Sequence, residues 1–136
     1  MLAPLVFDSS LLTTTLEAVQ RRSKAIRYHG LLECSRELDR GFERLNIDIR
    51  STDQLLTRFS LWSDGVFLLS VHKAGSRREG GWQLAEQVEG TLGEWTPFDV
   101  VERIEATIMS PTDVSRIWRP NASNPALQRT APRSDA

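Results

Sequence analysis

The chain has 136 residues, a formal net charge of −1 and a hydrophobic fraction of 40%. This length predicts one domain that is large enough to bury its own core, and so small a net charge excludes a global field that would recruit nucleic acid or an anionic membrane. No stretch approaches the length of a membrane span, and the apolar start MLAPLVF lacks the basic region of a signal peptide. A lone cysteine, Cys34, cannot form an internal disulfide, so we expect a reducing, cytoplasmic location.

The N-terminal third predicts helices. Ser9 or Ser10 can cap a first helix, because a serine oxygen accepts amide protons of the first turn. Apolar residues then recur near helical spacing, at Leu12, Leu16, Val19 and Ile26. A second helix is predicted over residues 31–44, where Leu31, Cys34, Leu38, Phe42 and Leu45 are three or four residues apart. Gly30 either ends the first helix in a left-handed conformation or bends one long helix, and the sequence leaves both open.

From Leu45 the pattern changes to an alternation of apolar and polar residues over 45–50, which is typical of a half-buried strand. Residues 55–73 then predict a hairpin around Ser63-Asp64-Gly65. A two-residue Asp64-Gly65 loop would leave both faces mixed. A three-residue loop with Gly65 left-handed is favoured, because Trp62 then faces Val66 and one face becomes apolar. That face would hold Thr57, Phe59, Leu61, Phe67, Leu69 and Val71.

The opposite face of this hairpin is too apolar to lie open in water. It would carry Leu56, Arg58, Ser60, Trp62, Val66, Leu68, Ser70 and His72. A second copy of the chain, a ligand or the N-terminal helices would have to cover it. Because tryptophan and arginine are common interface anchors and two-fold dimers are the commonest oligomers, we expect a homodimer through the Trp62 face.

Residues 82–93 are compatible with a strand or a helix. Flanking glycines and a helix start at Thr96 favour the strand, which would place Trp82, Leu84, Glu86 and Val88 on one face and complete a four-stranded antiparallel meander. Thr96-Pro97-Phe98-Asp99 predicts a helix from 97 to 109 that ends at Ser110-Pro111. Its buried stripe would be Phe98, Val101, Ile104, Ile108 and Met109, with Glu102, Arg103 and Glu105 outward.

After this helix, residues 112–118 would add a helical turn in which Val114, Ile117 and Trp118 plug the core. The elements together predict an α+β fold in residues 1–118: N-terminal helices, a four-stranded antiparallel sheet, and a C-terminal helix packed on one face. Residues 119–136 have almost no apolar content and are expected to be disordered.

Within that tail, the octapeptide NPALQRTA at residues 124–131 resembles the translated remnant of the recombination site that ends a mobile integron gene cassette. The resemblance implies a bacterial accessory gene that moves horizontally, and such cassettes commonly encode small folded proteins of unassigned function. It implies nothing about the fold or the site in residues 1–118.

The sequence contains no catalytic, metal or cofactor motif of its own, so individual side chains carry the hypotheses. His72 shares a face with Ser70, Trp62 and Arg58, where it would act as a general base or recognise an anion, or simply be satisfied by water at a sheet edge. Glu86 beside Trp82 would have a raised pKa and act as an acid, unless it reaches solvent. A basic patch on the first helix lacks the interleaved aromatics of a nucleic-acid site.

Two classes of function follow. The first is a binding or interaction protein that acts as a homodimer, such as an antitoxin- or immunity-like partner. The second is a small-molecule pocket between sheet and helices, with enzymatic use of His72 or Glu86 left open but disfavoured. The candidate pocket or interface residues are Arg58, Trp62, Leu68, Ser70, His72 and Glu86. No cofactor, metal, nucleic acid or membrane is expected.

Overall fold

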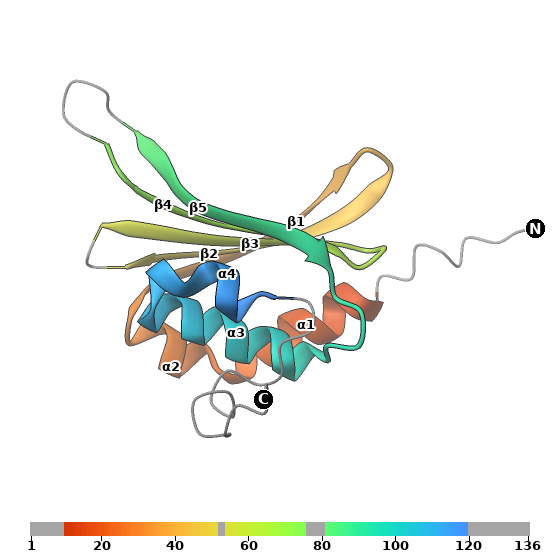
Figure 1. The fold of residues 1–136 in the computed structure, drawn as a ribbon. Helices are drawn as coiled ribbons and strands as arrows, with labels where there is room; N and C mark the ends of the chain where they lie inside the picture. Colours follow the sequence, from red (N-terminus) through yellow and green to blue (C-terminus); the bar gives the residue numbers. More distant parts are fainter. Residues whose placement is uncertain (1–9, 52–53, 76–80, 120–136) are drawn as a thin grey trace, which may run out of the picture.

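A computed structural model of the chain describes residues 10–51, 54–75 and 81–119, and over these ranges it confirms an α+β fold (Figure 1). The elements, in chain order, are α1 (Ser10–Arg21), α2 (Ser23–Arg27), β1 (Gly30–Asp39), β2 (Phe42–Ser51), β3 (Leu55–Trp62), β4 (Val66–Ala74), β5 (Trp82–Thr91), α3 (Pro97–Met109), the 3₁₀ turn η2 (Pro111–Asp113) and α4 (Val114–Ile117).

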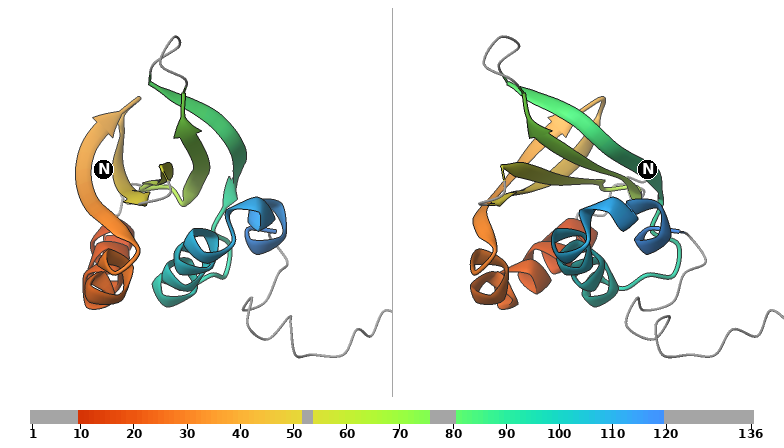
Figure 2. Two further views of the ribbon diagram at one scale, coloured as in Figure 1. Left: turned by 90° about the vertical axis from the view of Figure 1, so that its left-hand side faces the viewer. Right: turned by 60° about the vertical axis from the view of Figure 1, so that its left-hand side comes forward.

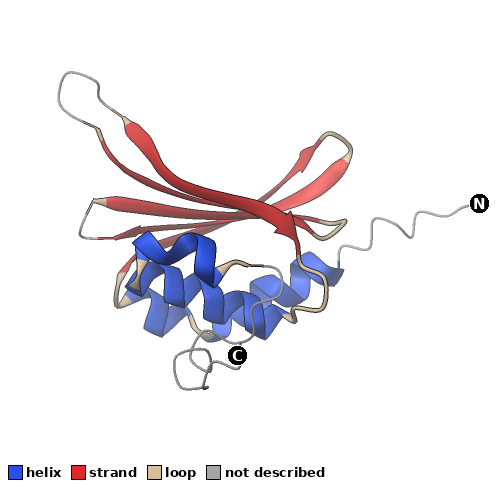
Figure 3. Cartoon of the chain, viewed as in Figure 1, coloured by secondary structure: helices blue, strands red, loops and turns tan. Residues whose placement is uncertain are grey.

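The strands form one antiparallel sheet in the order β1-β2-β3-β4-β5, so the predicted number of four strands is wrong and five are present in the described ranges. The helices all lie on one face of this sheet (Figure 3). Such a two-layer arrangement buries the apolar face of each layer against the other. None of the helices in the described ranges lies on the opposite sheet face.

The predicted helix over residues 31–44 is wrong. This segment forms β1, a tight turn at Arg40-Gly41, and the start of β2. Arg40 and Gly41 have φ values of +56° and +86°, as in the two-residue turn that matches the twist of a hairpin. Strand β1 lies at the edge of the sheet and buries few side chains. Its apolar residues therefore need not alternate with polar ones, as they do in a strand with one buried face. Cys34, predicted to lie in the core, is exposed, and only Leu32 of this strand is buried.

Gly30 ends the helical segment and begins β1, which settles the two alternatives left open by the sequence. It does not adopt the predicted left-handed conformation. A Cβ at this position would lie 2.4 Å from the carbonyl oxygen of Arg50. Glycine is therefore required here by the close approach of β1 to β2, and not by its own φ.

The β3–β4 hairpin closes through the predicted three-residue loop. Leu61 pairs with Phe67, and Gly65 has a φ of +92°. The Gly65 N–H donates to the Trp62 carbonyl at 2.9 Å, and the Val66 N–H donates to Asp64 Oδ1 at 3.1 Å. The side chains predicted to share the apolar face are all buried, namely Thr57, Phe59, Leu61, Phe67, Leu69 and Val71.

Trp118 occupies the centre of the core between sheet and helices, which confirms the prediction that it fills this core. It is fully buried, with its ring centroid 5.3 Å from those of both Phe59 and Phe67. Its indole N–H donates to Thr107 Oγ1 at 2.7 Å, so the only polar atom of the side chain is satisfied. Val114 and Ile117 are buried beside it. This plug ties α4 to α3 and to the middle of the sheet.

Helix α3 has the predicted bounds and the predicted capping box between Thr96 and Asp99. Its buried stripe is nevertheless rotated, since Phe98 and Met109 are 61% and 65% exposed. Arg103, expected to face outward, is buried with its guanidinium carbon 4.0 Å from the centroid of the Trp95 ring. The helix packs against α1 as well as the sheet, and the aromatic face of Trp95 offsets the burial of the charge.

Strand β5 confirms the strand interpretation of residues 82–93, but its side chains do not share one face. Val71 pairs with Glu86, whereas the next residue, His72, pairs with Leu84. Ala85 is therefore the extra residue of a β-bulge, which reverses the alternation. Trp82 and Leu84 lie on the open face, and Glu86 lies on the helix side.

The apolar start (residues 1–9) and the tail that carries the cassette-like octapeptide lie outside the described residues, apart from Arg119. Within the described part of the chain, no helix combines the length and the apolar character needed to cross a membrane.

We expect Gly65→Ala to lower the free energy of unfolding by at least about 1 kcal/mol, because an L side chain is strained at positive φ. Urea unfolding at equilibrium measures the change. Gly90→Ala in β5 is the matched control, since its φ is not positive and an added Cβ meets only the Phe67 ring, at 3.4 Å. Equal effects of the two substitutions would contradict the left-handed turn.

Candidate functional site

The sheet face turned away from the helices is a trough. Figure 2 shows β1 and β5 rising on either side of β3 on this face, with the helices below. A central hollow of about 480 Å³ lies in it. Its lining residues are Ser35, Glu37, Arg44, Asn46, Asp48, Arg58, Ser60, Trp62, Leu68, Ser70, His72 and Gln87.

A further hollow continues the trough at each end. One, of about 510 Å³, shares Arg44, Trp62, Leu68 and Gln87 with the central hollow and reaches Asp64. The other, of about 250 Å³, shares Asp48 and Arg58 with it and reaches Trp82. We call the three together the groove, and the two outer ones the Asp64 hollow and the Trp82 hollow.

The structure brings most of the sequence-predicted site residues together. Arg58, Trp62, Leu68, Ser70 and His72 all line the central hollow. Glu86 does not, because the bulge at Ala85 places it on the helix side, away from Trp82. The predicted location also changes: these side chains lie on the face opposite the helices, and not between sheet and helices.

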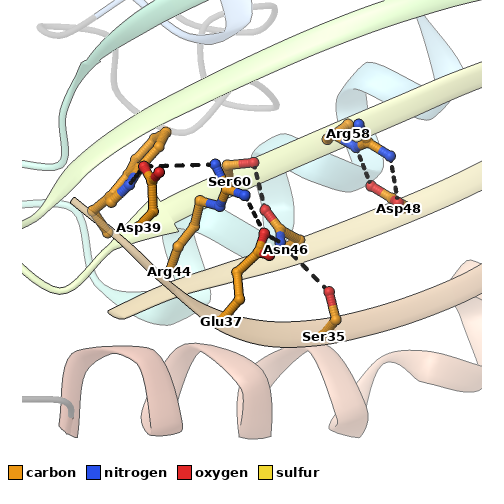
Figure 4. Close-up of polar contacts among 9 residues, drawn as sticks. Ser35, Glu37, Asp39, Arg44, Asn46, Asp48, Arg58 and Ser60 are labelled. Atoms are coloured by element: carbon orange, nitrogen blue, oxygen red, sulfur yellow. Dashed lines mark hydrogen bonds and ion pairs between the residues drawn. The ribbon is translucent and has the colours of Figure 1, made fainter. Parts of the chain in front are cut away.

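The charged residues of the central hollow pair with one another. Arg58 makes a bidentate contact with Asp48, its Nε and Nη2 donating at 2.8 and 3.0 Å (Figure 4). Arg44 donates to Glu37, which also accepts from the Asn46 amide at 2.8 Å. The hydrogen bond from Arg44, followed by that from Asn46, holds the pKa of Glu37 below its usual range.

Ser60 extends this set, since its hydroxyl donates to Asn46 Oδ1 at 2.8 Å. The Asn46 amide therefore uses both ends, oxygen and nitrogen, and its orientation is fixed by two partners. The result is a preorganised row of polar groups across β1, β2 and β3 (Figure 4).

Two tryptophans mark the length of the groove. The indole N–H of Trp62 donates to Asp39 Oδ2 at 2.8 Å, and the Arg44 guanidinium carbon lies 5.5 Å from its ring centroid. At the other end, the Arg50 guanidinium carbon lies 5.6 Å from the ring centroid of Trp82. Arg50 belongs to β2 and Trp82 to β5, so the curl of the sheet brings side chains of non-neighbouring strands together.

Ser70 and His72 form the one contact in the central hollow that resembles a nucleophile and its base, with Ser70 Oγ 3.0 Å from His72 Nε2. Burial, and next the charge of Arg58, lowers the pKa of His72 below 6.5, so its imidazole is neutral at pH 7. The backbone of Ser70 pairs with Arg58 of β3 on one side and with Gln87 of β5 on the other. This geometry suits hydrogen bonding to a ligand better than nucleophilic attack.

Sequence reasoning missed the β1 and β2 side of the site, namely Ser35, Glu37, Arg44, Asn46 and Asp48. For Ser35, Glu37 and Arg44 the cause is the helix predicted over residues 31–44, whereas Asn46 and Asp48 are the polar positions of the strand predicted over 45–50. The available signal was the polar residue at every second position of 33–39 followed by Arg40-Gly41, which is the pattern of an exposed hairpin. Among the described residues, no group of three histidine, cysteine, aspartate or glutamate side chains is placed to hold a metal ion.

We expect His72 to make the fold less stable as the pH falls. Its folded pKa lies below its ordinary value of 6.5, so the unfolded chain takes up the proton first. The effect is absent above pH 6.5 and sets in below it. Between about pH 7.5 and about pH 5.5, the wild type should therefore lose more unfolding free energy in urea than His72→Gln. Equal losses in the wild type and in His72→Gln would contradict the assignment.

Comparisons of the chain with models of protein families, with curated proteins and with solved structures gave no match. The groove geometry is therefore the basis for assigning a function.

Proposed function

We propose that the protein binds a small, uncharged, polar ligand in the central hollow of the groove, without changing it chemically. One observation carries the proposal: the charged groups of the hollow neutralise one another, and most of the other polar groups in its lining are hydroxyls and amides. Glu37 and Asp48 stand against Arg44 and Arg58, and the formal charge of the lining sums to zero with a neutral His72.

Charge balance decides between ligand classes. An anion or a cation would have to separate an existing guanidinium–carboxylate pair before it gained a partner of its own, and Arg58 already uses two nitrogens on Asp48. A ligand with hydroxyl or amide groups needs no such exchange. It can use the remaining lone pairs of the carboxylates and the oxygens of Ser35 and Ser70.

Size and shape agree with a small ligand. The central hollow lies within the roughly 300–1,000 Å³ that small-molecule sites occupy. Trp62 and Leu68 supply its apolar surface, and Trp62 is fixed by Asp39 and Arg44 before any ligand arrives. Preorganisation of this kind reduces the entropy lost on binding.

A protein partner is the second candidate, and it includes the homodimer and the antitoxin- or immunity-like roles. The observation that favours it is the apolar end of the groove around the Trp82 hollow. Leu31 and Leu84 are 53% and 54% exposed there, and Trp82 is 37% exposed. Tryptophan is a frequent anchor of protein interfaces. Either candidate is compatible with the accessory role implied by the cassette-like octapeptide.

The test is amide chemical-shift mapping with a panel of small uncharged and charged polar compounds. We expect uncharged compounds to shift the amides of Asn46, Ser60 and Ser70, and charged compounds of similar size to bind at least about tenfold more weakly. Gln87→Trp should block the effect, because Gln87 is exposed and lines the central hollow.

Ser115→Trp, on the exposed side of α4, is the matched control and should leave binding unchanged. Binding restricted to charged compounds, or binding that Gln87→Trp does not weaken, would refute the proposal. Doubling of the mass in light scattering, abolished by Gln87→Trp and accompanied by no ligand binding, would instead favour the homodimer.

A further inference from the structure

The groove is longer than a single small molecule requires. The central hollow shares Trp62 and Leu68 with the Asp64 hollow, and it shares Asp48 and Arg58 with the Trp82 hollow. These shared residues make the three hollows one continuous path along the open face. An occupant that used all of it would be elongated.

Each part of this path combines a flat apolar surface with polar groups. Trp62 lies where the central and Asp64 hollows meet, and Trp82 lies in the third hollow. Both indoles are held against an arginine. The remaining tryptophans have a different role, because Trp118 is fully buried and Trp95 packs against it with ring centroids 6.0 Å apart.

The polar groups beside the two indoles are planar and fixed in orientation. Asp48 and Arg58 form a bidentate pair, and Asn46 is held by two partners. Planar groups with two donors or two acceptors match neighbouring hydroxyls on a sugar ring, while the C–H face of the ring stacks on an aromatic side chain. The lining of the Trp82 hollow is also neutral in sum, with Glu33 and Asp48 against Arg50 and Arg58.

We infer that the groove binds an uncharged oligosaccharide, with one sugar unit on Trp62 and another on Trp82. The inference rests on the proposed function and specifies its ligand class. The length of the ligand distinguishes this site from one that binds a single sugar. An oligosaccharide must span the central hollow to contact both Trp62 and Trp82. A peptide segment is the competing occupant of an elongated groove, and the experiment below distinguishes it.

The probes are hexasaccharides of β-1,4-linked glucose, α-1,4-linked glucose and β-1,4-linked N-acetylglucosamine. The corresponding free monosaccharides are tested separately for comparison. The readout is the set of indole N–H signals in the NMR spectrum of the full chain. We expect one hexasaccharide to shift the signals of Trp62 and Trp82 and to leave that of Trp118 unchanged. The corresponding monosaccharide should bind at least about tenfold more weakly, because it reaches only one indole.

Trp82→Ala should weaken hexasaccharide binding by about fivefold or more and leave monosaccharide binding at Trp62 unchanged. Trp82 lies on an edge strand, and an unchanged Trp118 signal shows that the variant is folded. Phe98→Ala is the control, since Phe98 is an exposed aromatic residue on α3, away from the groove. It should bind like the wild type.

Failure of every hexasaccharide to shift Trp62 and Trp82 overturns the inference, as does equal hexasaccharide affinity of Trp82→Ala and the wild type. If another uncharged compound still shifts the groove amides and Gln87→Trp blocks it, only the carbohydrate class is lost and the proposed function stands. Binding of a peptide in place of any sugar, weakened by Trp82→Ala, overturns the inference and supports the protein-partner candidate. Hexasaccharide binding that Gln87→Trp does not weaken refutes the proposed function and this inference together.

Discussion

The pairing of Leu61 with Phe67 across the Gly65 turn determines which side chains of the central strands face the helices. A one-residue shift of this register would pair Phe59 with Ser70 and Leu61 with Leu68, so that both faces of the hairpin would mix apolar and polar side chains. The positive φ of Gly65 sets the register, because it allows a three-residue loop in place of a two-residue one. The core and the groove are therefore two consequences of the same turn.

Curvature and one bulge then give the open face its shape. The extra residue Ala85 moves Trp82 and Leu84 from the helix side to the open side. Without it, the strict alternation of β5 would place Trp82 and Leu84 on the helix side together with Glu86. The curl of the sheet further brings Trp82 to Arg50, although two strands separate them. The Trp82 end of the groove exists only because both features are present.

The polar row in the groove is not explained by the stability of the fold. Guanidinium and carboxylate groups that remain partly exposed, as in Arg58 and Asp48, contribute about 0–1 kcal/mol per pair. If another element covered this sheet face, apolar side chains at these positions would stabilise the fold equally well. No described element covers it. Fixed, mutually neutral polar groups beside a restrained indole instead reduce the reorganisation that a ligand would require. This preorganisation is the physical argument for the ligand binding that we propose for the groove.

The sequence by itself determined the elements whose signals are local. The Gly65 loop, the alternation in 45–50, the capping box at Thr96 and the Trp118 plug all depend on nearby residues, and the structure confirms them. The tertiary structure decided that 30–39 is a strand, because the helical spacing of Leu31, Cys34 and Leu38 competes with the polar alternation of 33–39 and an edge strand gains its conformation from the ladder with β2. The tertiary structure also decided that Arg103 is buried and that Glu86 is outside the groove. These outcomes depend on Trp95 and on a bulge, and neither leaves a periodic trace in the sequence.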